Sequence, residues 1–509
     1  MNLRRRRKIV QIAGSLAVLA TITFLSCTGD KMKESNSQDQ PNLLFIFTDQ
    51  QRQQAVGFMD GDPVHTPNLD RLADESLILE NAVSNYPLCS PYRGMLLTGK
   101  NPHKTGVTSN CHSGRNKNGI YLKTNEVTIS DILDEEGYEL GYVGKWHLDP
   151  PKGPEVDNYL NAEWDGNTPP GPRRHGFDFW YSYQTFDYHF KPHYWTGNTK
   201  ETYRMVEPGE WSPRHEAKIA MDFLKGEGIY ERDKSKPFAL FMSLNPPHPP
   251  FQYVPEEYKE RYKDKSIEEL LNRPNVKFEG PGSRSREHVV NYFAAITGID
   301  EQLGKVFQTL EEEGLNENTI VVFTSDHGEM MGSHGRMGKN TWFNESILVP
   351  FTIKYPGKIE PRRDDILYNT VDIMPTMLGL LGKGNRIPYD VDGTDYSDYF
   401  MGKQTNIRKP ELSLFMRINP TYPAYGQRGF YTGDYTFAMS FNPGDLSENH
   451  YLYHNTSDPY QLDNMADEKP ELVEQYKNKL LEALKKYDDP WGVFYKNNIL
   501  YMRKNQNNE

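Results

Sequence analysis

Four short, largely apolar runs constrain the fold of this 509-residue chain more than any other feature. None shows the strict apolar–polar alternation of a strand with one wet face, and each stops abruptly at a polar cluster. Such runs are typical of strands buried on both faces, and therefore of a largely parallel sheet between layers of helices. The runs are Asn42–Thr48, which ends at Asp49-Gln50; Tyr138–Val143, which ends at Gly144-Lys145-Trp146-His147; Phe238–Leu244, which ends at Asn245-Pro-Pro-His248; and Thr319–Thr324, which ends at Ser325-Asp326-His327.

Helical patterns lie between these runs. Pro67–Glu75 should be a helix with Thr66 as its cap, Val127–Glu136 a second, and His288–Glu313 a long third that ends before Gly314. Strands alternating with helices predict a layered α/β fold. Since such sheets bind ligands beyond the carboxyl ends of their strands, the four polar clusters should meet at one edge.

Two regions depart from this pattern. Residues 150–215 are rich in proline, glycine and aromatic residues, which indicates a lid or a substrate rim. After about residue 405 the pattern changes to short strands with tight turns and then a helix at Glu471–Lys486, which predicts a small antiparallel sheet with a covering helix. We therefore expect a large domain at residues 41–404 and a C-terminal subdomain at 405–509.

The N-terminus is predicted to be a targeting segment, with residues 1–26 as a signal peptide. Arg4–Lys8 is basic, Ile9–Leu25 is apolar, and Phe24-Leu-Ser-Cys27 is close to the site at which bacterial lipoproteins are cleaved and lipidated. An uncleaved anchor helix is the alternative, although the apolar run is slightly short for one. Residues 27–40 are polar and indicate a flexible tether. The expected location is the periplasm or the surface of a bacterium, with a lipid anchor as the only membrane contact.

Composition excludes some function classes. A mean hydropathy of −0.76 excludes a polytopic membrane protein. The formal net charge of −12 argues against nucleic acid as a partner. This net charge is still compatible with a small anionic substrate if the site itself is basic.

The three cysteines, Cys27, Cys89 and Cys111, are too few for a disulfide scaffold. If Cys27 carries a lipid, a Cys89–Cys111 bridge is one alternative for an exported protein. A different role for Cys89, as a nucleophile, is favoured by the segment Cys89-Ser-Pro-Tyr-Arg-Gly-Met-Leu-Leu-Thr-Gly99. Its proline suits the first turn of a helix, so Cys89 should lie at a helix N-terminus with Arg93 nearby, where a thiolate is stabilised. The sequence is therefore also compatible with an unmodified cysteine as the nucleophile.

The same segment, C-x-P-x-R followed by T-G, resembles the signature of the type I sulfatases, with Tyr92 where a small Ser or Ala is usual. The resemblance extends over roughly residues 40–490 and includes Asp372-Ile-Met-Pro-Thr and Asp458-Pro-Tyr-Gln-Leu-Asp-Asn-Met. It implies an alkaline-phosphatase-like α/β sandwich, with a large, mostly parallel sheet flanked by helices and a small C-terminal subdomain. It also implies that a maturation enzyme oxidises Cys89 to formylglycine (3-oxoalanine), whose hydrate attacks sulfur.

The resemblance further implies one Ca²⁺ per chain. Its ligands would be the modified Cys89 and the residues that end two predicted strands, Asp49 with Gln50 and Asp326 with His327. Two carboxylates suit a hard cation, whereas imidazole is a weaker partner for it. Gln50 stands where the commoner pattern has a second Asp, so Asp49 and Asp326 carry most of this prediction.

The remaining family positions are Lys145, His147, His248 and Lys339. By resemblance, Lys145 and Lys339 hold the sulfate, and His248 or Lys339 protonates the leaving oxygen. His147 then acts as the base on the remaining hydroxyl of the hydrate, and Arg93 belongs to the same catalytic set. A sulfate monoester needs such cations and a proton donor.

The predicted function is hydrolysis of a sulfate monoester on a sulfated carbohydrate, as part of glycan degradation. His189, His193 and Trp195 are candidates for sugar contacts because they lie in the aromatic-rich region. The alternatives are a phosphonate monoester or phosphodiester hydrolase of the same superfamily and a non-catalytic glycan-binding lipoprotein.

Overall fold

The computed structural model describes residues 40–506 apart from positions 113, 115–117, 151–163, 198–202, 206–209, 230, 423, 443 and 446. The predicted signal peptide (1–26), Cys27 and all but the last residue of the predicted tether (27–40) lie outside the described residues.

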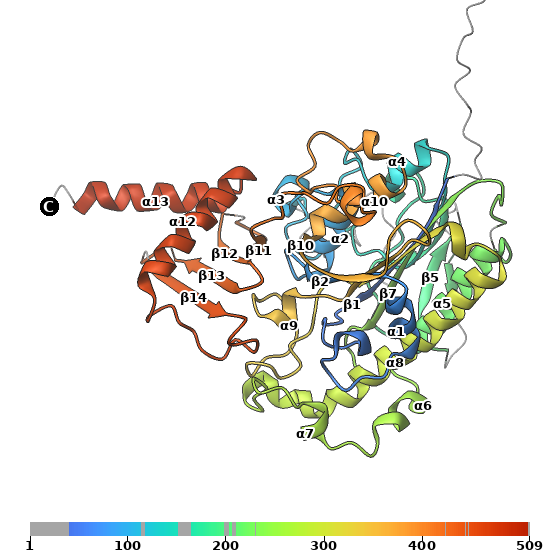
Figure 1. The fold of residues 1–509 in the computed structure, drawn as a ribbon, viewed down its shortest axis with the longest axis horizontal. Coiled ribbons are helices and arrows are strands. Elements are labelled where there is room, and N and C mark those ends of the chain that lie inside the picture. The colour runs from blue at the N-terminus through green and yellow to red at the C-terminus, as the bar shows by residue number, and fades with distance from the viewer. Residues whose placement is uncertain are drawn as a thin grey trace, which may run out of the picture. The chain divides into compact units, whose positions relative to one another are not determined.

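A ten-stranded sheet with the order β10-β2-β9-β8-β1-β7-β3-β4-β5-β6 forms the centre of the molecule (Figure 1). Five of its nine adjacent pairs are parallel. Its strands are β1 (Asn42–Asp49), β2 (Leu77–Val83), β3 (Glu139–Lys145), β4 (Phe179–Tyr183), β5 (His193–Thr196), β6 (Tyr203–Met205), β7 (Phe238–Pro247), β8 (Thr319–Ser325), β9 (Phe351–Lys354) and β10 (Arg362–Asn369).

The four predicted strands are the four central ones. β8, β1, β7 and β3 are consecutive neighbours and all pair in parallel, which confirms the predicted sheet. Along β1, Leu44 and Ile46 point into one apolar core, whereas Leu43, Phe45 and Phe47 point into the other. Both faces are buried, and for this reason the run does not alternate in polarity.

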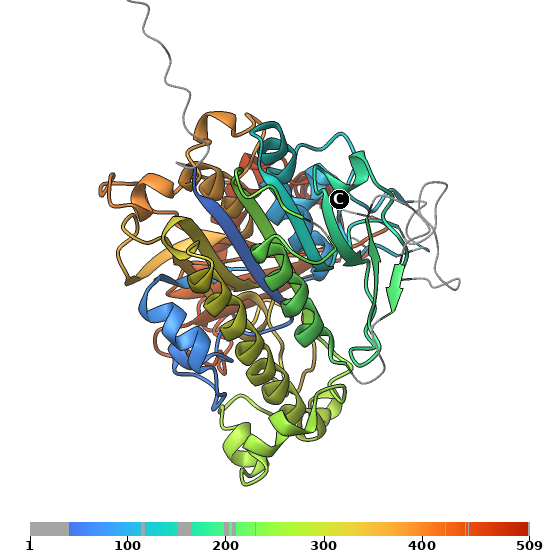
Figure 2. The same cartoon turned by 90° about the vertical axis from the view of Figure 1, so that its right-hand side faces the viewer.

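Helices cover both faces of this sheet. α1 (Pro67–Asp74), α5 (Ser212–Lys225) and α8 (Ser285–Glu312) pack on the first core, and α5 and α8 lie side by side in Figure 2. α2 (Cys89–Thr98), α4 (Ile129–Glu135) and α10 (Ile373–Leu380) pack on the second core. Shorter helices are α3 (Pro102–Thr105), α6 (Glu256–Lys259), α7 (Ile267–Leu270), α9 (Asn344–Ile347) and α11 (Ser397–Phe400).

The three predicted helices are confirmed, and Thr66 occupies the predicted N-cap position of the first, although without a side-chain capping bond. The Thr66 side chain makes no capping bond to α1, because its hydroxyl instead donates to Asp70 Oδ1 at 3.1 Å and accepts from the Gly57 amide. Thr128 does cap α4, where its hydroxyl accepts from the Asp131 amide at 3.2 Å. Among the described residues, no helix combines the length and apolar character that crossing a bilayer requires.

The C-terminal region forms a second, four-stranded antiparallel sheet, as predicted. It contains β11 (Ser413–Ile418), β12 (Gly426–Tyr431), β13 (Tyr435–Phe441) and β14 (Glu448–His454), followed by α12 (Pro470–Lys486) and α13 (Pro490–Gln506). Both helices pack on one face of this sheet, where a single helix was expected. Its other face packs on residues that follow β8, including Trp342 and Phe343. The boundary at residues 404–405 stays a prediction, since the chain from residue 37 onward groups as one compact unit.

The aromatic-rich region at 150–215, predicted to be a lid or a substrate rim, contains three strands of the main sheet. Its strand β4 pairs in parallel with β3, and β5 and β6 add two antiparallel strands at the edge of the sheet. Trp180, Tyr181 and Tyr183 are buried there. Where it is described, this region therefore extends the main sheet as well as lining the cavity described below.

Candidate active site

The polar clusters at the carboxyl ends of β1, β3, β7 and β8 meet at one edge of the sheet, as predicted. The register places Thr48 of β1 beside Ser325 of β8, and Asp49 beside Pro247 of β7. α2 begins at Cys89 at the same edge and ends at Gly99, whose φ of +65° suits glycine. Parallel pairing therefore brings together residues that are up to about 280 positions apart, such as Gln50 and Asp326.

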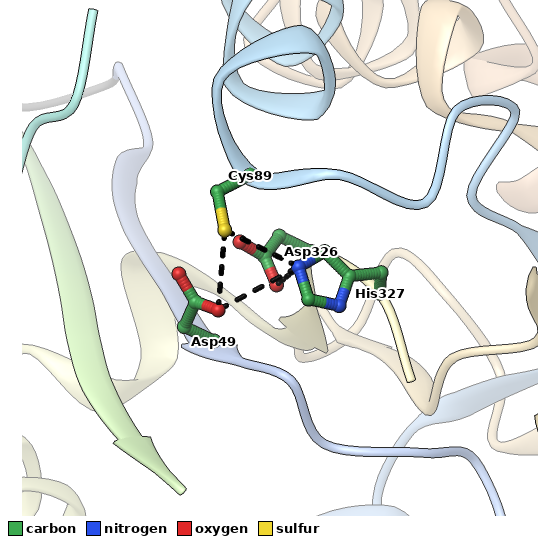
Figure 3. A group of neighbouring side chains, drawn as sticks. All are labelled: Asp49, Cys89, Asp326 and His327. Atoms are coloured by element: carbon green, nitrogen blue, oxygen red, sulfur yellow. Dashed lines mark hydrogen bonds and ion pairs between the residues drawn. The ribbon is translucent and has the colours of Figure 1, made fainter. Parts of the chain in front are cut away.

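Asp49, Cys89, Asp326 and His327 form a buried group whose ligand atoms all lie within 4.8 Å of one another (Figure 3). Cys89 Sγ lies 3.5 Å from Asp49 Oδ1 and 3.4 Å from His327 Nε2. The other ring nitrogen of His327, Nδ1, donates to the Gly328 carbonyl, so Nε2 is the nitrogen that faces the group.

These side chains fit a divalent cation. Burial and the neighbouring Asp49 carboxylate raise the pKa of Asp326 to about 7, which reflects the cost of holding two carboxylates together out of water. Burial also acts to raise the pKa of Asp49, but Lys145 and Lys339 hold it well below its ordinary value. A bound cation would relieve the carboxylate repulsion.

Gln50 lies beside this group, although its side chain already has partners. Its Oε1 accepts from Lys339 Nζ at 2.6 Å and its Nε2 donates to Glu329. The predicted role of Gln50 as a metal ligand stays a prediction. Its φ of +73° shows that β1 turns sharply directly after Asp49.

The guanidinium group of Arg93 contacts both carboxylates. Its Nη2 lies 3.2 Å from Asp49 Oδ2 and 3.4 Å from Asp326 Oδ2, and its Nη1 donates to the Lys145 carbonyl and to Ser243 Oγ. Arg93 is buried and does not line the cavity, so it acts as a positioning residue in this geometry.

Lys145 and Lys339 place two ammonium groups next to Cys89. Lys339 Nζ lies 3.2 Å from Cys89 Sγ, and Lys145 Nζ donates to Asp49 Oδ2 at 2.7 Å and to Asn245 Oδ1 at 3.0 Å. Burial and the Asp49 carboxylate act to raise the pKa of the Cys89 thiol. The two lysines outweigh them and, with a smaller effect from His327, lower that pKa to about 6. The site therefore stabilises negative charge at this position.

Two histidines complete the site. His147 Nε2 donates to the Cys111 carbonyl at 3.1 Å, and its Nδ1 has no hydrogen-bond partner among the described residues. His248 Nδ1 donates to the Pro249 carbonyl at 2.7 Å, which leaves Nε2 for other contacts. Burial, and then nearby lysines, hold the pKa of both imidazoles well below the ordinary value. Neutral imidazoles of this kind can accept a proton.

A cavity of about 430 Å³ opens onto this site. It brings together the five predicted residues Cys89, Lys145, His147, His248 and Lys339. Asn110, Trp164, Asp165, Thr185, Phe186 and Asp187 form the rest of its lining. The candidate nucleophile, the two lysines and the two histidines therefore line the same cavity.

The predicted sugar contacts find no support in this geometry. His189, His193 and Trp195 are buried and do not line the cavity, because they pack in the wall behind it. His193 Nε2 pairs with Asp165 Oδ2 at 2.5 Å, and the rings of Phe186 and Trp195 flank its imidazole. Sequence reasoning missed Trp164, which lines the cavity with 40% of its surface exposed.

Asn245 and Asp187 were also missed. Asn245 accepts from Lys145 and donates to Asp187 Oδ1 at 2.9 Å, so it links the sulfate-binding candidates to the cavity wall. Its position directly after a predicted strand was a signal that could have identified it. The predicted alternative of a Cys89–Cys111 disulfide is wrong, since neither cysteine forms a disulfide bond in the described part of the chain.

Comparisons with known proteins agree with this arrangement. The family model described as Sulfatase matches residues 41–383, and one described as N-sulphoglucosamine sulphohydrolase, C-terminal, matches residues 332–488. An endo-4-O-sulfatase of Bacteroides thetaiotaomicron is 38% identical over 92% of this chain and 97% of its own length. An ulvan-active sulfatase of Formosa agariphila is 36% identical over 96% of this chain and 89% of its own length.

Solved structures agree as well. A sulfatase from Bacteroides fragilis has a TM-score of 0.83 and 38% identity, covering 92% of this chain and all of its own. A phosphonate monoester hydrolase of Agrobacterium radiobacter has a TM-score of 0.67 at 20% identity, covering 88% of this chain and 96% of its own. At that identity the second likeness concerns the fold alone.

Proposed function

This chain belongs to the sulfatase family and is a sulfuric ester hydrolase, and we propose that its substrate is a sulfate monoester of a carbohydrate. One observation carries the proposal most: Cys89, two lysines and two histidines line the same cavity, above a buried pair of carboxylates. Relatives that are named for action on ulvan or as an endo-4-O-sulfatase support a glycan over a small sulfate ester.

We assign binding of the sulfate group to Lys145 and Lys339. Both ammonium groups lie next to the nucleophile position and line the cavity. Positive charge fixed where negative charge develops lowers the barrier for sulfuryl transfer. Lys339 is held charged by Cys89 and Asp49, which raise its pKa although burial acts to lower it.

We assign the proton transfers to the histidines. A lysine with a raised pKa is a weak acid, so His248 is the better donor to the leaving alcohol oxygen once the bound sulfate anion favours its protonated form. His147 Nδ1 has no hydrogen-bond partner within the described part of the chain and can accept a proton on the nucleophile side.

The proposal also includes a bound calcium ion and the oxidation of Cys89. Asp49, Asp326 and His327, with Gln50 beside them, would hold Ca²⁺, which supplies positive charge that stabilises an oxyanion at position 89. Oxidation of Cys89 by a maturation enzyme would supply a formylglycine hydrate, whose oxygen takes the place that Sγ occupies. The low pKa of the thiol supports an anionic oxygen at this position.

Export remains part of the proposal. A basic stretch, an apolar stretch and Cys27 at the N-terminus support cleavage and lipidation, and a glycan substrate suits a periplasmic or surface enzyme. Metabolic labelling with a lipid precursor, compared between wild type and Cys27→Ala, tests this part. Label of equal intensity in both would refute the lipid anchor.

The reaction is tested by comparing kcat/KM on matched aryl sulfate and aryl phosphodiester esters and on sulfated disaccharides. We expect sulfate release to dominate. A large preference for phosphorus would favour the alternative, a phosphonate monoester or phosphodiester hydrolase. The absence of any ester hydrolysis would leave the glycan-binding alternative.

The nucleophile is tested separately. Peptide mass spectrometry after co-expression with a maturation enzyme should show the aldehyde at position 89. An intact thiol at that position in fully active protein would refute the formylglycine assignment.

A further inference from the structure

A second cavity of about 520 Å³ lies beside the candidate active site, between the large sandwich and the C-terminal sheet. Asn110 and Trp164 line both cavities. Lys339 lines the first, and its neighbour in the chain, Asn340, lines the second. The two cavities are therefore neighbours that share part of their lining.

The second cavity contains one charged side chain, Arg417 of β11. The remaining lining residues are neutral, and no carboxylate of the described part of the chain lies within 4.0 Å of the Arg417 guanidinium. Within the described part of the chain, its Nη1 donates a hydrogen bond to Gln427 Oε1 at 3.3 Å. In a protein with a net charge of −12, an exposed arginine without an acidic partner in a neutral cavity suits an anion.

Hydrogen bonds on both sides of Arg417 fix its place relative to Cys89. The Met416 amide donates to the Asn85 carbonyl at 2.7 Å, and the Ile418 amide donates to the Tyr86 hydroxyl at 3.2 Å. Tyr86 lies three residues before Cys89, where α2 begins. The strand that carries Arg417 is thus attached to the segment that carries the nucleophile.

Two other features shape this cavity. Asn340 has a φ of +68°, and its Oδ1 is buried without a hydrogen-bond partner among the described residues. On the opposite strand, Gly426 approaches Arg417 so closely that a Cβ would lie 2.0 Å from the Arg417 carbonyl oxygen. The glycine therefore keeps β12 close to the strand that carries Arg417.

We propose that this second cavity, the Arg417 cavity, binds the sugar next to the sulfated one, and that Arg417 pairs with an anionic group on that sugar. The group is a carboxylate or a second sulfate, since a guanidinium forms paired hydrogen bonds with either. This inference rests on the proposed function and narrows its substrate class to a polyanionic glycan.

The test uses three oligosaccharides with the same scissile sulfate. The neighbouring sugar carries a carboxylate in the first, a second sulfate in the second, and a neutral hydroxymethyl group in the third. Mature wild-type enzyme is compared with Arg417→Gln and Arg417→Lys. Arg408→Gln is the matched control, because Arg408 is exposed in the same region and pairs with Glu411.

We expect Arg417→Gln to reduce kcat/KM about tenfold on one or both anionic substrates, mainly through KM. The neutral substrate should be unaffected, Arg417→Lys should restore part of the loss, and Arg408→Gln should behave as wild type. Whether the loss falls on the carboxylate or the sulfate substrate identifies the anion.

Equal losses on all three substrates, or no loss on either anionic one, would overturn the inference. Cleavage of the neutral substrate alone would also overturn it, while leaving the proposed hydrolysis of sulfate esters intact. If the wild type releases sulfate from none of these substrates, nor from an aryl sulfate, the proposed function itself fails.

Discussion

The catalytic edge of the central sheet and the outer wall of its cavity are built in different ways. At the catalytic edge, Asp49, Lys145 and Asp326 end or directly follow parallel strands, so the register of the sheet fixes their positions. The outer wall consists of the stretch Trp164–Asp187 and the strands β11 and β12, which packing of distant segments brings together. We propose that the edge carries out the chemistry and that the wall selects the substrate. Mutations in the two regions should therefore have different kinetic signatures.

The largest effect is expected from Cys89→Ala at the catalytic edge. Loss of the nucleophile should lower kcat by about 10⁴-fold or more, with an unchanged circular dichroism spectrum. Cys111→Ala is the matched control, since the contact that Cys111 makes with His147 uses its main-chain carbonyl. Substantial turnover by purified Cys89→Ala would remove this residue from the mechanism.

His248→Ala should come next, with a loss of about 10²- to 10⁴-fold in kcat. The loss should be smaller for aryl sulfates with acidic leaving groups, because these alcohols leave without help from a proton donor. Measuring kcat across a series of leaving-group pKa values checks this. A loss that does not vary with the leaving group would assign His248 to sulfate binding instead.

Removal of calcium should affect the stability of the catalytic edge as well as its activity. A ligand present at 100 times its Kd stabilises the folded state by about 2.7 kcal/mol, so chelation should lower the Tm. Because Asp326 has a pKa of about 7 without the cation, protons compete with calcium below that pH. The apparent calcium affinity should therefore fall as the pH drops from 8 to about 6. Equal Tm values with calcium and with chelator would contradict the site.

The smallest effect is expected at the outer wall. Trp164→Ala should raise KM for a sulfated oligosaccharide about tenfold with little change in kcat, because an exposed indole offers a stacking surface for a sugar ring. Trp164→Phe should retain part of the affinity. Trp195→Phe, which changes a buried ring, should leave KM unchanged. If Trp195→Phe raised KM as much as Trp164→Ala, this result would support the prediction from the sequence that Trp195 contacts a sugar.

The same contrast explains which predictions from the sequence are confirmed. Asp49, Lys145 and Asp326 could be located because a strand buried on both faces has a visible pattern and a visible end. The helix that begins at Cys89 could be located from Pro91 and Gly99. His193 could not be placed, because a histidine between aromatic residues fits a sugar site and a buried pair with Asp165 equally well.

The sequence by itself determined the sheet, the edge at which ligands bind, and the chemical groups that converge there, because short-range patterns and parallel pairing fix these features. Only the tertiary structure decided which aromatic rings face the cavity, that Arg93 contacts both carboxylates, and that Arg417 and Trp164 line the same second cavity. These depend on packing between segments far apart in the chain, and no local pattern records which side chain finally meets solvent.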